Sequence, residues 1–323
     1  MALLEVENLS IAVAGASKWI PVVEDCSFSV EERQTLGVVG ESGCGKSLTA
    51  MAIMGLLEES QVRVTAGKIV FDNENLLNLP PNQRRKIMGD KMSMIFQEPM
   101  TSLNPVYRIG DQIVEAIKQH RKMSAAQYRT RALELLKLVK IPNHTQRIDS
   151  YPHQLSGGQR QRVMIAMALS CEPKLLIADE PTTALDVTVQ KEVLQLMLDL
   201  QDRTGTAIVL ISHDLGVIAE TCNEVAVMYR GRIVESSTTK ELFGNIQHPY
   251  THGLLKSIPS IDAEAEWLDA IPGRVPTLEE NLAGCAFHPR CPHAQSECTD
   301  TQPSALCTKS DYVVRCHFVG KLE

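Results

Sequence analysis

The sequence contains no hydrophobic run approaching the ~20 residues that a helix needs to cross a bilayer. Its first residues, MALLEVENLS, show no basic segment followed by an apolar stretch, so we expect no signal peptide. Positive charge is not in excess, because 32 Lys and Arg stand against 39 Asp and Glu, for a net charge of −7. A general nucleic-acid binder would usually be basic. These absences predict a cytosolic protein that does not bind nucleic acid.

Internal repeats and low-complexity segments are also absent. Apolar residues make up 44% of the 323-residue chain, which is enough for about two folded domains. In a cytosolic chain, nine cysteines do not predict a disulfide framework. Their distribution is uneven, however, because five of the nine lie beyond residue 284. The end of the chain therefore needs a separate explanation.

Strands and helices are predicted by hydrophobic pattern and residue type. Strands are predicted at 3–13, 28–40, 68–72, 91–97, 174–179, 207–212 and 224–231, and helices at 47–57 and 188–205. Between about 98 and 170 the pattern becomes helical, and after 243 it becomes irregular, rich in Pro, Gly and Cys. We therefore predict an α/β core over 1–243 with a helical insert at about 98–170, followed by a C-terminal extension at 244–323.

A phosphate-binding loop is predicted at Gly40–Ser47, where GESGCGKS fits the pattern G-x-x-x-x-G-K-[ST]. The motif follows an apolar strand and opens a helix, as it should. Its glycines let backbone N–H groups surround phosphates without side-chain clashes. Lys46 is expected to reach the β- and γ-phosphates, and Ser47 to bind Mg²⁺. The fold class predicted is therefore an α/β P-loop NTPase.

Polar side chains stand at the ends of three other predicted strands. LLIADE ends in Asp179, which would hold Mg²⁺, and Glu180, which would orient and deprotonate the attacking water. MSMIFQ ends in Gln97, which could sense Mg²⁺ and that water, and IVLISH ends in His213, which could contact the γ-phosphate. Ligands collect at the carboxyl ends of strands in open α/β sheets, so these four side chains extend the predicted nucleotide site.

The stretch QLSGGQR (154–160) predicts a second anion site. Two glycines behind a serine open a predicted helix, and the free N–H groups of a helix start attract anions. Neither a lysine nor a magnesium ligand stands beside this turn in the sequence. The phosphate it would contact must therefore be held mainly by other residues.

Taken in order, these motifs resemble the ATP-binding subunit of an ABC transporter. The set comprises the phosphate loop, Gln97, LSGGQ (155–159), LLIADE (175–180), ALD (184–186) and His213. Four further segments are similar to the peptide-importer ATPases: FQEPMTSLNP (96–105), HPYTHGLL (248–255), IPGRVP (271–276) and GCAFHPRCPHAQSEC (284–298). The greatest likeness is to the D-type ATPase of dipeptide and oligopeptide importers, with the ATPase of an antimicrobial-peptide-sensitivity transporter as a close sibling.

The resemblance implies a role for each matching residue. ATP would be bound by Gly40, Glu41, Ser42, Gly43, Cys44, Gly45, Lys46, Ser47 and Leu48, with Mg²⁺ held by Ser47, Gln97 and Asp179. Catalysis would use Glu180, His213, Lys46 and Gln97. Trp19, the one aromatic in IAVAGASKWIPVV, would stack on adenine, although a partly buried loop tryptophan is an equal alternative. The signature residues Ser156, Gly157, Gly158 and Gln159 would face ATP held by a second subunit, and Asp186 would form the D-loop.

The cysteines of the C-terminal extension resemble the iron–sulfur ligand set of some importer ATPases. The residues concerned are Cys285, Cys291, Cys298 and Cys316. Four thiolates suit a [4Fe–4S] cluster or a tetrahedral zinc ion, and free thiols are the third alternative. We expect Cys307 to be a spare thiol, and His288 and His293 to be solvated rather than ligands.

The resemblance implies the ATP-hydrolysing motor of a bacterial importer, peripheral at the cytoplasmic face of the inner membrane. Its partners would be a second, paralogous ABC ATPase subunit, two integral-membrane permease subunits and, indirectly, a periplasmic solute-binding protein. Di- or oligopeptides are the expected cargo, with antimicrobial peptides, nickel or other small solutes as alternatives. A soluble ABC ATPase of DNA repair or translation is the alternative class, but such proteins typically carry long coiled coils or two ATPase domains. A non-hydrolysing subunit is disfavoured because Lys46, Asp179, Glu180 and His213 are all present.

Overall fold

A computed structural model describes residues 2–97, 102–183, 185–257, 270–280, 282–308 and 312–320. The chain divides into two compact units, which we describe separately. The first comprises Met1–Leu3, Val30–Gln34 and Leu76–Leu210, and the second comprises Leu4–Ser29, Thr35–Asn75 and Ile211–Glu323. We call them the helical unit and the loop unit. The C-terminal extension is part of the loop unit, and the predicted domain boundary at 243 stays a prediction.

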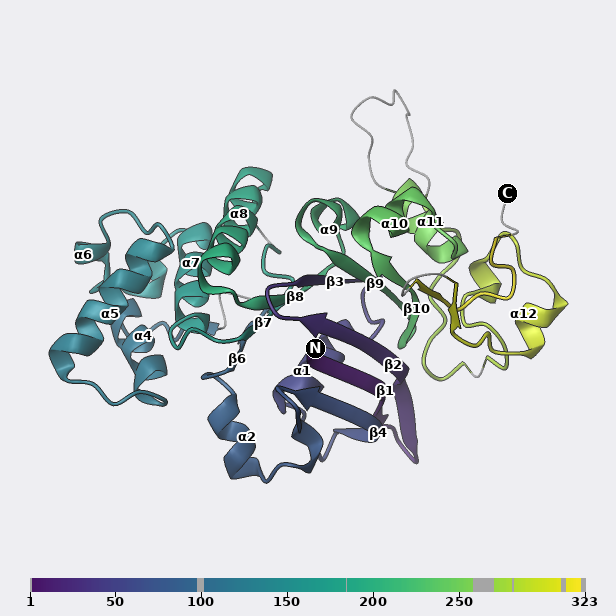
Figure 1. The fold of residues 1–323 in the computed structure, drawn as a ribbon, viewed down its shortest axis with the longest axis horizontal. Helices are drawn as coiled ribbons and strands as arrows, with labels where there is room; N and C mark the ends of the chain where they lie inside the picture. The colour runs from purple at the N-terminus through teal and green to yellow at the C-terminus, as the bar shows by residue number, and fades with distance from the viewer. Residues whose placement is uncertain are drawn as a thin grey trace. The chain divides into compact units, whose positions relative to one another are not determined.

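The loop unit contains an antiparallel sheet built from the first part of the chain (Figure 1). Its strands, in the order β2-β1-β4-β5, are β2 (Trp19–Glu31), β1 (Ala2–Ala14), β4 (Val62–Phe71) and β5 (Glu74–Asn75). β1 pairs with β4 from Leu4 opposite Phe71 to Val13 opposite Val62. The buried residues of β1 are mostly Leu, Val and Ile, and they pack one face of this sheet into the core.

A second set of strands in the loop unit joins the predicted phosphate loop to the end of the chain. All five residues of β3 (Thr35–Val39) are buried, and β3 pairs in parallel with β9 (Glu224–Tyr229). Antiparallel pairing then continues through β10 (Arg232–Thr238), β12 (Val313–Val314) and β11 (Leu306–Cys307). The C-terminal extension therefore adds two short strands to the sheet that contains β3.

Five helices and one short 3₁₀ turn complete the described part of the loop unit, apart from the end of β8. They are α1 (Lys46–Met54), α9 (Leu215–Thr221), α10 (Thr239–Gly244), α11 (Pro249–Lys256), η3 (His288–Arg290) and α12 (Ser296–Asp300), while η1 (Leu76–Asn78) belongs to the helical unit. Helix α9 packs closely on β3: a Cβ on Gly37 would lie 2.6 Å from Cγ2 of Ile218. Glycine at this position lets the helix approach the strand.

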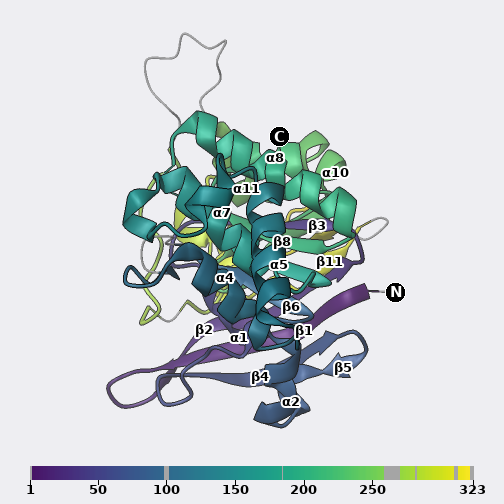
Figure 2. The ribbon, with the colours of Figure 1, turned by 90° about the vertical axis from the view of Figure 1, so that its left-hand side faces the viewer.

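The helical unit begins with parallel strands and is dominated by helices (Figures 1 and 2). β6 (Met92–Ile95) pairs with β7 (Leu175–Asp179), and β8 (Ala207–Ser212), which ends at the unit boundary, follows β7 in the sheet order. Helices α4, α5 and α7 pack against one another, and α7 also packs on β6 and α8. The helices are α2 (Pro81–Ile87), α4 (Ile109–Lys118), α5 (Ala125–Leu138), α6 (His144–Arg147), α7 (Gly157–Ala168) and α8 (Val187–Thr204), with η2 (Pro152–Gln154) before α7.

The predicted fold class is confirmed in its main features. Helices α4 to α7 lie between β6 and β7, where the sequence predicts the helical insert, although 98–101 lie outside the described residues. After α11 the described residues form only short elements. The nine cysteines, all among the described residues, form no disulfide with one another. Among the residues that the structure describes, no helix is both long and apolar enough to span a membrane.

Candidate nucleotide site

The predicted phosphate loop lies between β3 and α1 in the loop unit. At Gly40, a Cβ would fall onto the carbonyl oxygen of Met228, so only glycine can occupy the position. Gly45 has a φ of 106° and is the N-cap of α1, a conformation that side chains with a Cβ rarely adopt. The positive φ of Gly45 lets the chain turn sharply from the loop into α1. Such a helix start is an anion-binding site.

The side chain of Lys46 turns back onto the phosphate loop. It is buried, and Nζ donates hydrogen bonds to the carbonyl oxygens of Gly40 (2.7 Å) and Glu41 (3.1 Å). Nζ also lies 3.7 Å from Sγ of Cys44, whose pKa is raised by burial and lowered in part by the Lys46 charge. Ser47 follows in the first turn of α1. The ammonium group is therefore fixed inside the loop by its own backbone.

Gln97 and Glu180 meet at one edge of the helical unit. The parallel register places Ile95 opposite Ala178, so the chain leaves β6 and β7 side by side two residues before Gln97 and Glu180. Nε2 of Gln97 donates to Oε2 of Glu180 (3.0 Å), and the hydroxyl of Thr183 donates to the same oxygen (3.1 Å). Glu180 also has a left-handed φ of 46°, which is uncommon outside glycine and concentrates at functional sites.

Asp179 ends β7 as a buried carboxylate, directly before Glu180. A carboxylate and a serine hydroxyl are oxygen ligands that Mg²⁺ prefers. Asp179 and Ser47 therefore fit a magnesium ion by their chemistry.

His213 and Trp19 are both in the loop unit but differ in setting. His213 follows β8 directly, is exposed, and precedes Asp214, whose carboxylate caps α9 through the N–H groups of Gly216 (2.8 Å) and Val217 (3.2 Å). Trp19 begins β2 and is half-buried, and the guanidinium carbon of Arg63 lies 4.0 Å from its ring centroid. One face of the ring is thus occupied by a cation. Adenine stacking on Trp19 stays a prediction.

The LSGGQ residues form the start of α7. Ser156 is its N-cap: Oγ accepts the N–H of Gln159 (3.3 Å), and Oε1 of Gln159 accepts the N–H of Ser156 (3.2 Å). Ser156 and Gly157 are exposed, so this helix start can be reached from outside the chain. A Cβ on Gly158 would lie 2.6 Å from Cγ1 of Val189 on α8, which explains the second glycine.

Asp186, the predicted D-loop residue, caps α8 through the N–H of Val189 (2.9 Å), while Ala184 lies outside the described residues.

Two residues missed by the sequence analysis contact Glu41 of the phosphate loop. Arg290 forms a two-pronged ion pair with the Glu41 carboxylate, with Nη1 to Oε2 at 2.6 Å and Nη2 to Oε1 at 3.0 Å. The hydroxyl oxygen of Tyr250 accepts the N–H of Glu41 (2.9 Å). Both residues stand in segments that resemble the importer ATPases, which was the only signal pointing to them.

The four predicted ligand cysteines line one small cavity in the loop unit. Cys285, Cys291, Cys298 and Cys316 share it with Phe287, His248 and the three histidines 288, 293 and 317. Burial, together with a smaller contribution from the three other cysteines, raises the pKa of Cys285 to about 11. Within the described ranges, however, no group of three or more His, Cys, Asp or Glu side chains is arranged to hold a metal ion. The donor set suits a soft metal, but the sulfurs are not closed around one.

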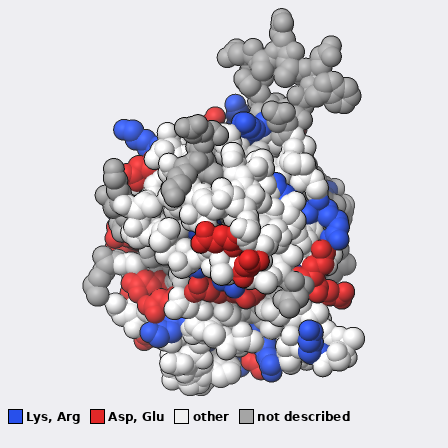
Figure 3. Space-filling view, turned by 90° about the vertical axis from the view of Figure 1, so that its right-hand side faces the viewer, with Lys and Arg blue, Asp and Glu red and all other residues white. Residues whose placement is uncertain are grey.

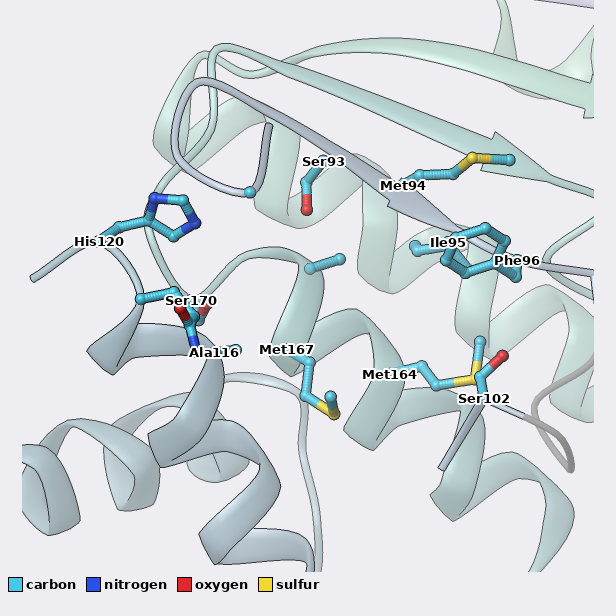
Figure 4. Close-up of a pocket in the computed structure, with 13 residues that line it drawn as sticks. Ser93, Met94, Ile95, Phe96, Ser102, Ala116, His120, Met164, Met167 and Ser170 are labelled. Atoms are coloured by element: carbon cyan, nitrogen blue, oxygen red, sulfur yellow. The ribbon is translucent and has the colours of Figure 1, made fainter. Parts of the chain in front are cut away.

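The helical unit contains a larger, mostly apolar cavity of about 310 Å³, whose lining includes Phe96, the residue before Gln97 (Figure 4). Strand β6 contributes Met94 and Ile95, and helix α7 contributes Met164 and Met167. The full lining is Gly89, Ser93, Met94, Ile95, Phe96, Ser102, Ala116, Gln119, His120, Met164, Met167, Ala168 and Ser170. Phe96, directly before Gln97, is 43% exposed. We call this the β6–α7 cavity.

Comparison with known proteins defines the class to which this fold and loop belong. The family "ABC transporter" matches residues 23–183, and the family "Oligopeptide/dipeptide transporter, C-terminal region" matches residues 234–298. The chain therefore belongs to the ABC transporter ATPases and carries the C-terminal region of that transporter group.

Individual relatives cover almost the whole chain. It is 51% identical to the oligopeptide transport ATP-binding protein AppD of Bacillus subtilis, over 97% of this chain and 96% of AppD. It is 45% identical to the dipeptide transport ATP-binding protein DppD of Escherichia coli, over 98% of this chain and 97% of DppD. Among solved structures, a dimeric ATP-binding cassette bound to ADP and Pi matches with a TM-score of 0.66 and 27% identity, over 73% of this chain and 98% of the cassette.

Proposed function

We propose that this chain is the ATP-hydrolysing subunit of a bacterial inner-membrane importer for di- or oligopeptides, bound at the cytoplasmic face. The observation that carries the proposal is the full-length likeness to peptide-transport subunits, extension included. The phosphate loop and signature alone would fit ABC transporters of any cargo. The matched C-terminal region narrows the choice to peptide transport.

Each residue of the site has a role in this proposal. The loop from Gly40 to Leu48 binds the phosphates through backbone N–H groups and Lys46, while Ser47 and Asp179 hold Mg²⁺. Glu180 takes a proton from the attacking water, and the hydrogen bonds from Gln97 and Thr183 hold its carboxylate in place. The exposed His213 contacts the γ-phosphate. Phosphoryl transfer needs mainly positioning and charge neutralisation, which these groups supply.

A second ATPase subunit completes each site. The sequence holds one phosphate loop and one LSGGQ, and Ser156 and Gly157 are exposed at the start of α7. Two such subunits meeting head to tail would place this helix start against ATP bound by the neighbour, where N–H groups and the helix dipole favour the γ-phosphate. A paralogous subunit is the partner we propose, together with two permease subunits and a periplasmic binding protein that delivers cargo.

The β6–α7 cavity is the proposed docking site for a permease subunit. It is lined mostly by apolar side chains and includes Phe96, so a permease segment seated there would contact the residue directly before Gln97. Movement of the permease would then shift the position of Gln97 at the hydrolysis site. Residues 98–101 of FQEPMTSLNP, which belong to this region of the chain, lie outside the described residues.

We also propose that Cys285, Cys291, Cys298 and Cys316 hold a [4Fe–4S] cluster or a zinc ion. Their common cavity and soft thiol donors support this, and thiolate ligation would draw the four sulfurs together. Anaerobically purified protein should contain about four iron atoms per chain with visible absorption, or about one zinc. A colourless protein without either metal by elemental analysis would show that the thiols are free.

Co-purification tests the proposed function as a whole. The tagged chain is captured from detergent-solubilised membranes of its native cells, and uptake of a labelled dipeptide is measured with and without its gene. We expect two integral-membrane subunits and a second ATPase in the eluate, and loss of uptake on deletion. Recovery of ribosomes or DNA instead would favour the soluble class.

On the face shown in Figure 3, acidic side chains gather near the centre, which does not suit a nucleic-acid surface.

A further inference from the structure

Two segments of the C-terminal extension contact Glu41 of the phosphate loop, and a third holds the arginine through which one of them does so. HPYTHGLL contributes Tyr250, and GCAFHPRCPHAQSEC contributes Arg290. IPGRVP contributes the carbonyl oxygens of Ile271 and Pro272, which accept hydrogen bonds from Arg290 at 3.4 and 3.1 Å. All of these residues are in the loop unit. Nucleotide chemistry does not itself require an extension at this place, so the convergence needs its own explanation.

Arg290 is held in one orientation. Its side chain is only 3% exposed, and a guanidinium is rarely buried unless it is paired. The carboxylate of Glu41 accepts hydrogen bonds from Nη1 and Nη2, while the two backbone carbonyls accept hydrogen bonds from Nε and Nη2. A two-pronged pair of this kind fixes direction as well as distance. Glu41 therefore cannot rotate without leaving a buried cation unpaired, which is costly.

Tyr250 fixes the backbone of the same residue. It is fully buried against Tyr229 and Phe287, with ring centroids 4.6 and 5.4 Å away. Its hydroxyl takes the N–H of Glu41, while the carbonyl oxygens of Gly40 and Glu41 take Nζ of Lys46. The peptide units that the extension orients are thus the ones that hold the catalytic ammonium.

We infer that Arg290 and Tyr250 are positioning residues for Lys46, through which the C-terminal extension sets the affinity of the phosphate loop for nucleotide. The inference rests on the proposed role of this loop in ATP binding. Loss of either contact frees the Gly40–Glu41 backbone, so that Lys46 and the loop N–H groups must be ordered again when phosphate binds. Ordering of this kind weakens binding.

The test is a fluorescence titration of the purified full-length chain with an N-methylanthraniloyl ATP analogue and Mg²⁺. Arg290→Gln and Glu41→Gln are each expected to weaken binding about tenfold, equal to about 1.4 kcal/mol. The double variant should be no weaker than either single variant, because both remove the same contact. Arg290→Lys, which keeps the charge but not the fork, should recover part of the affinity. Tyr250→Phe removes one hydroxyl and keeps the ring packing, and it should also weaken binding. It therefore tests the inference even if Arg290→Gln destabilises the fold and lowers the Tm.

Arg315→Gln is the matched control. Arg315 also directly precedes a cysteine of the extension and pairs with a carboxylate, Asp25, at 2.7 Å, but Asp25 lies on β2 and not in the loop. Its affinity should stay within about twofold of wild type. Unchanged binding in Arg290→Gln and Tyr250→Phe, or equal loss in Arg315→Gln, would overturn the inference. Lys46→Ala distinguishes failure of this inference from failure of the proposed function, because normal nucleotide binding in that variant would refute the proposed role of the loop itself.

Discussion

Glu180 is the residue on which hydrolysis depends in this account. One of its carboxylate oxygens accepts hydrogen bonds from Gln97 and Thr183, which hold the side chain at the end of β7. Its left-handed backbone turns the chain sharply there, and Thr183 N–H closes the turn on the Glu180 carbonyl at 3.2 Å. A carboxylate fixed in this way is prepared to orient a water molecule and accept its proton.

Glu180→Gln should bind ATP but lose turnover, by a factor of about 10² or more in the assembled transporter. The amide keeps the size and one acceptor oxygen but cannot take a proton from water. ATPase rate and analogue binding are measured on the same preparation. Glu172→Gln is the control, since Glu172 also has a left-handed φ, of 56°, but stands in an ion pair with Arg131. Normal turnover in Glu180→Gln would remove Glu180 as the base.

The sequence predicts Lys46, Asp179 and Glu180 as site residues because motif spacing and strand ends limit where such residues can stand. It could not identify the Arg290–Glu41 pair. The two residues are 249 positions apart, and charge alone does not show which partner a given arginine meets. Nor does a motif predict that Arg63 lies over Trp19, because that contact depends on how β2 and β4 place their side chains.

At the scale of elements, β6, α4 and α7 together form the cavity that we propose for the permease. Met164 on α7 lines it, as does the exposed Phe96, which lies between the end of β6 and Gln97 in the chain. An apolar lining is suited to an apolar helix end, and a buried charge there would oppose docking.

Met164→Glu should reduce recovery of permease subunits with the tagged chain by about tenfold, while binding of the ATP analogue stays unchanged. Met123→Glu is the control, because Met123 is an exposed methionine of the same unit that does not line the cavity. Co-purification and nucleotide titration give the two readouts. Equal recovery of permease with both variants would place the docking site elsewhere.

Strands were predictable where buried Val, Ile and Leu ran together, as in β7 and β8, which are buried throughout. The exact bounds of the strands were less predictable. The predicted strand region 28–40 is in fact the end of β2 and the whole of β3, separated by a turn in which Arg33 has a φ of 63°. No Gly or Pro marks that turn. The pairing of β12 with β10 could not be predicted from the sequence either, because two valines alone show no strand pattern.

At the scale of the whole chain, the C-terminal extension is built into the loop unit. It supplies β11 and β12 to the sheet that contains β3, and it supplies Arg290 and Tyr250 to Glu41. The sequence marked the extension by its cysteines and irregular pattern and so predicted a separate region. Pairing in a sheet depends on long-range register, which local pattern does not encode.

The central claim is that the chain holds only part of each working site and that a second subunit supplies the signature helix. The direct test is the ATPase rate of the monomeric full-length chain, compared with that of the assembled transporter at saturating ATP and Mg²⁺. Because the helix start of the neighbour would stabilise charge on the γ-phosphate, we predict a rate in the monomer lower by about 10² or more. Equal rates per chain in a preparation shown to be monomeric by light scattering would contradict the account.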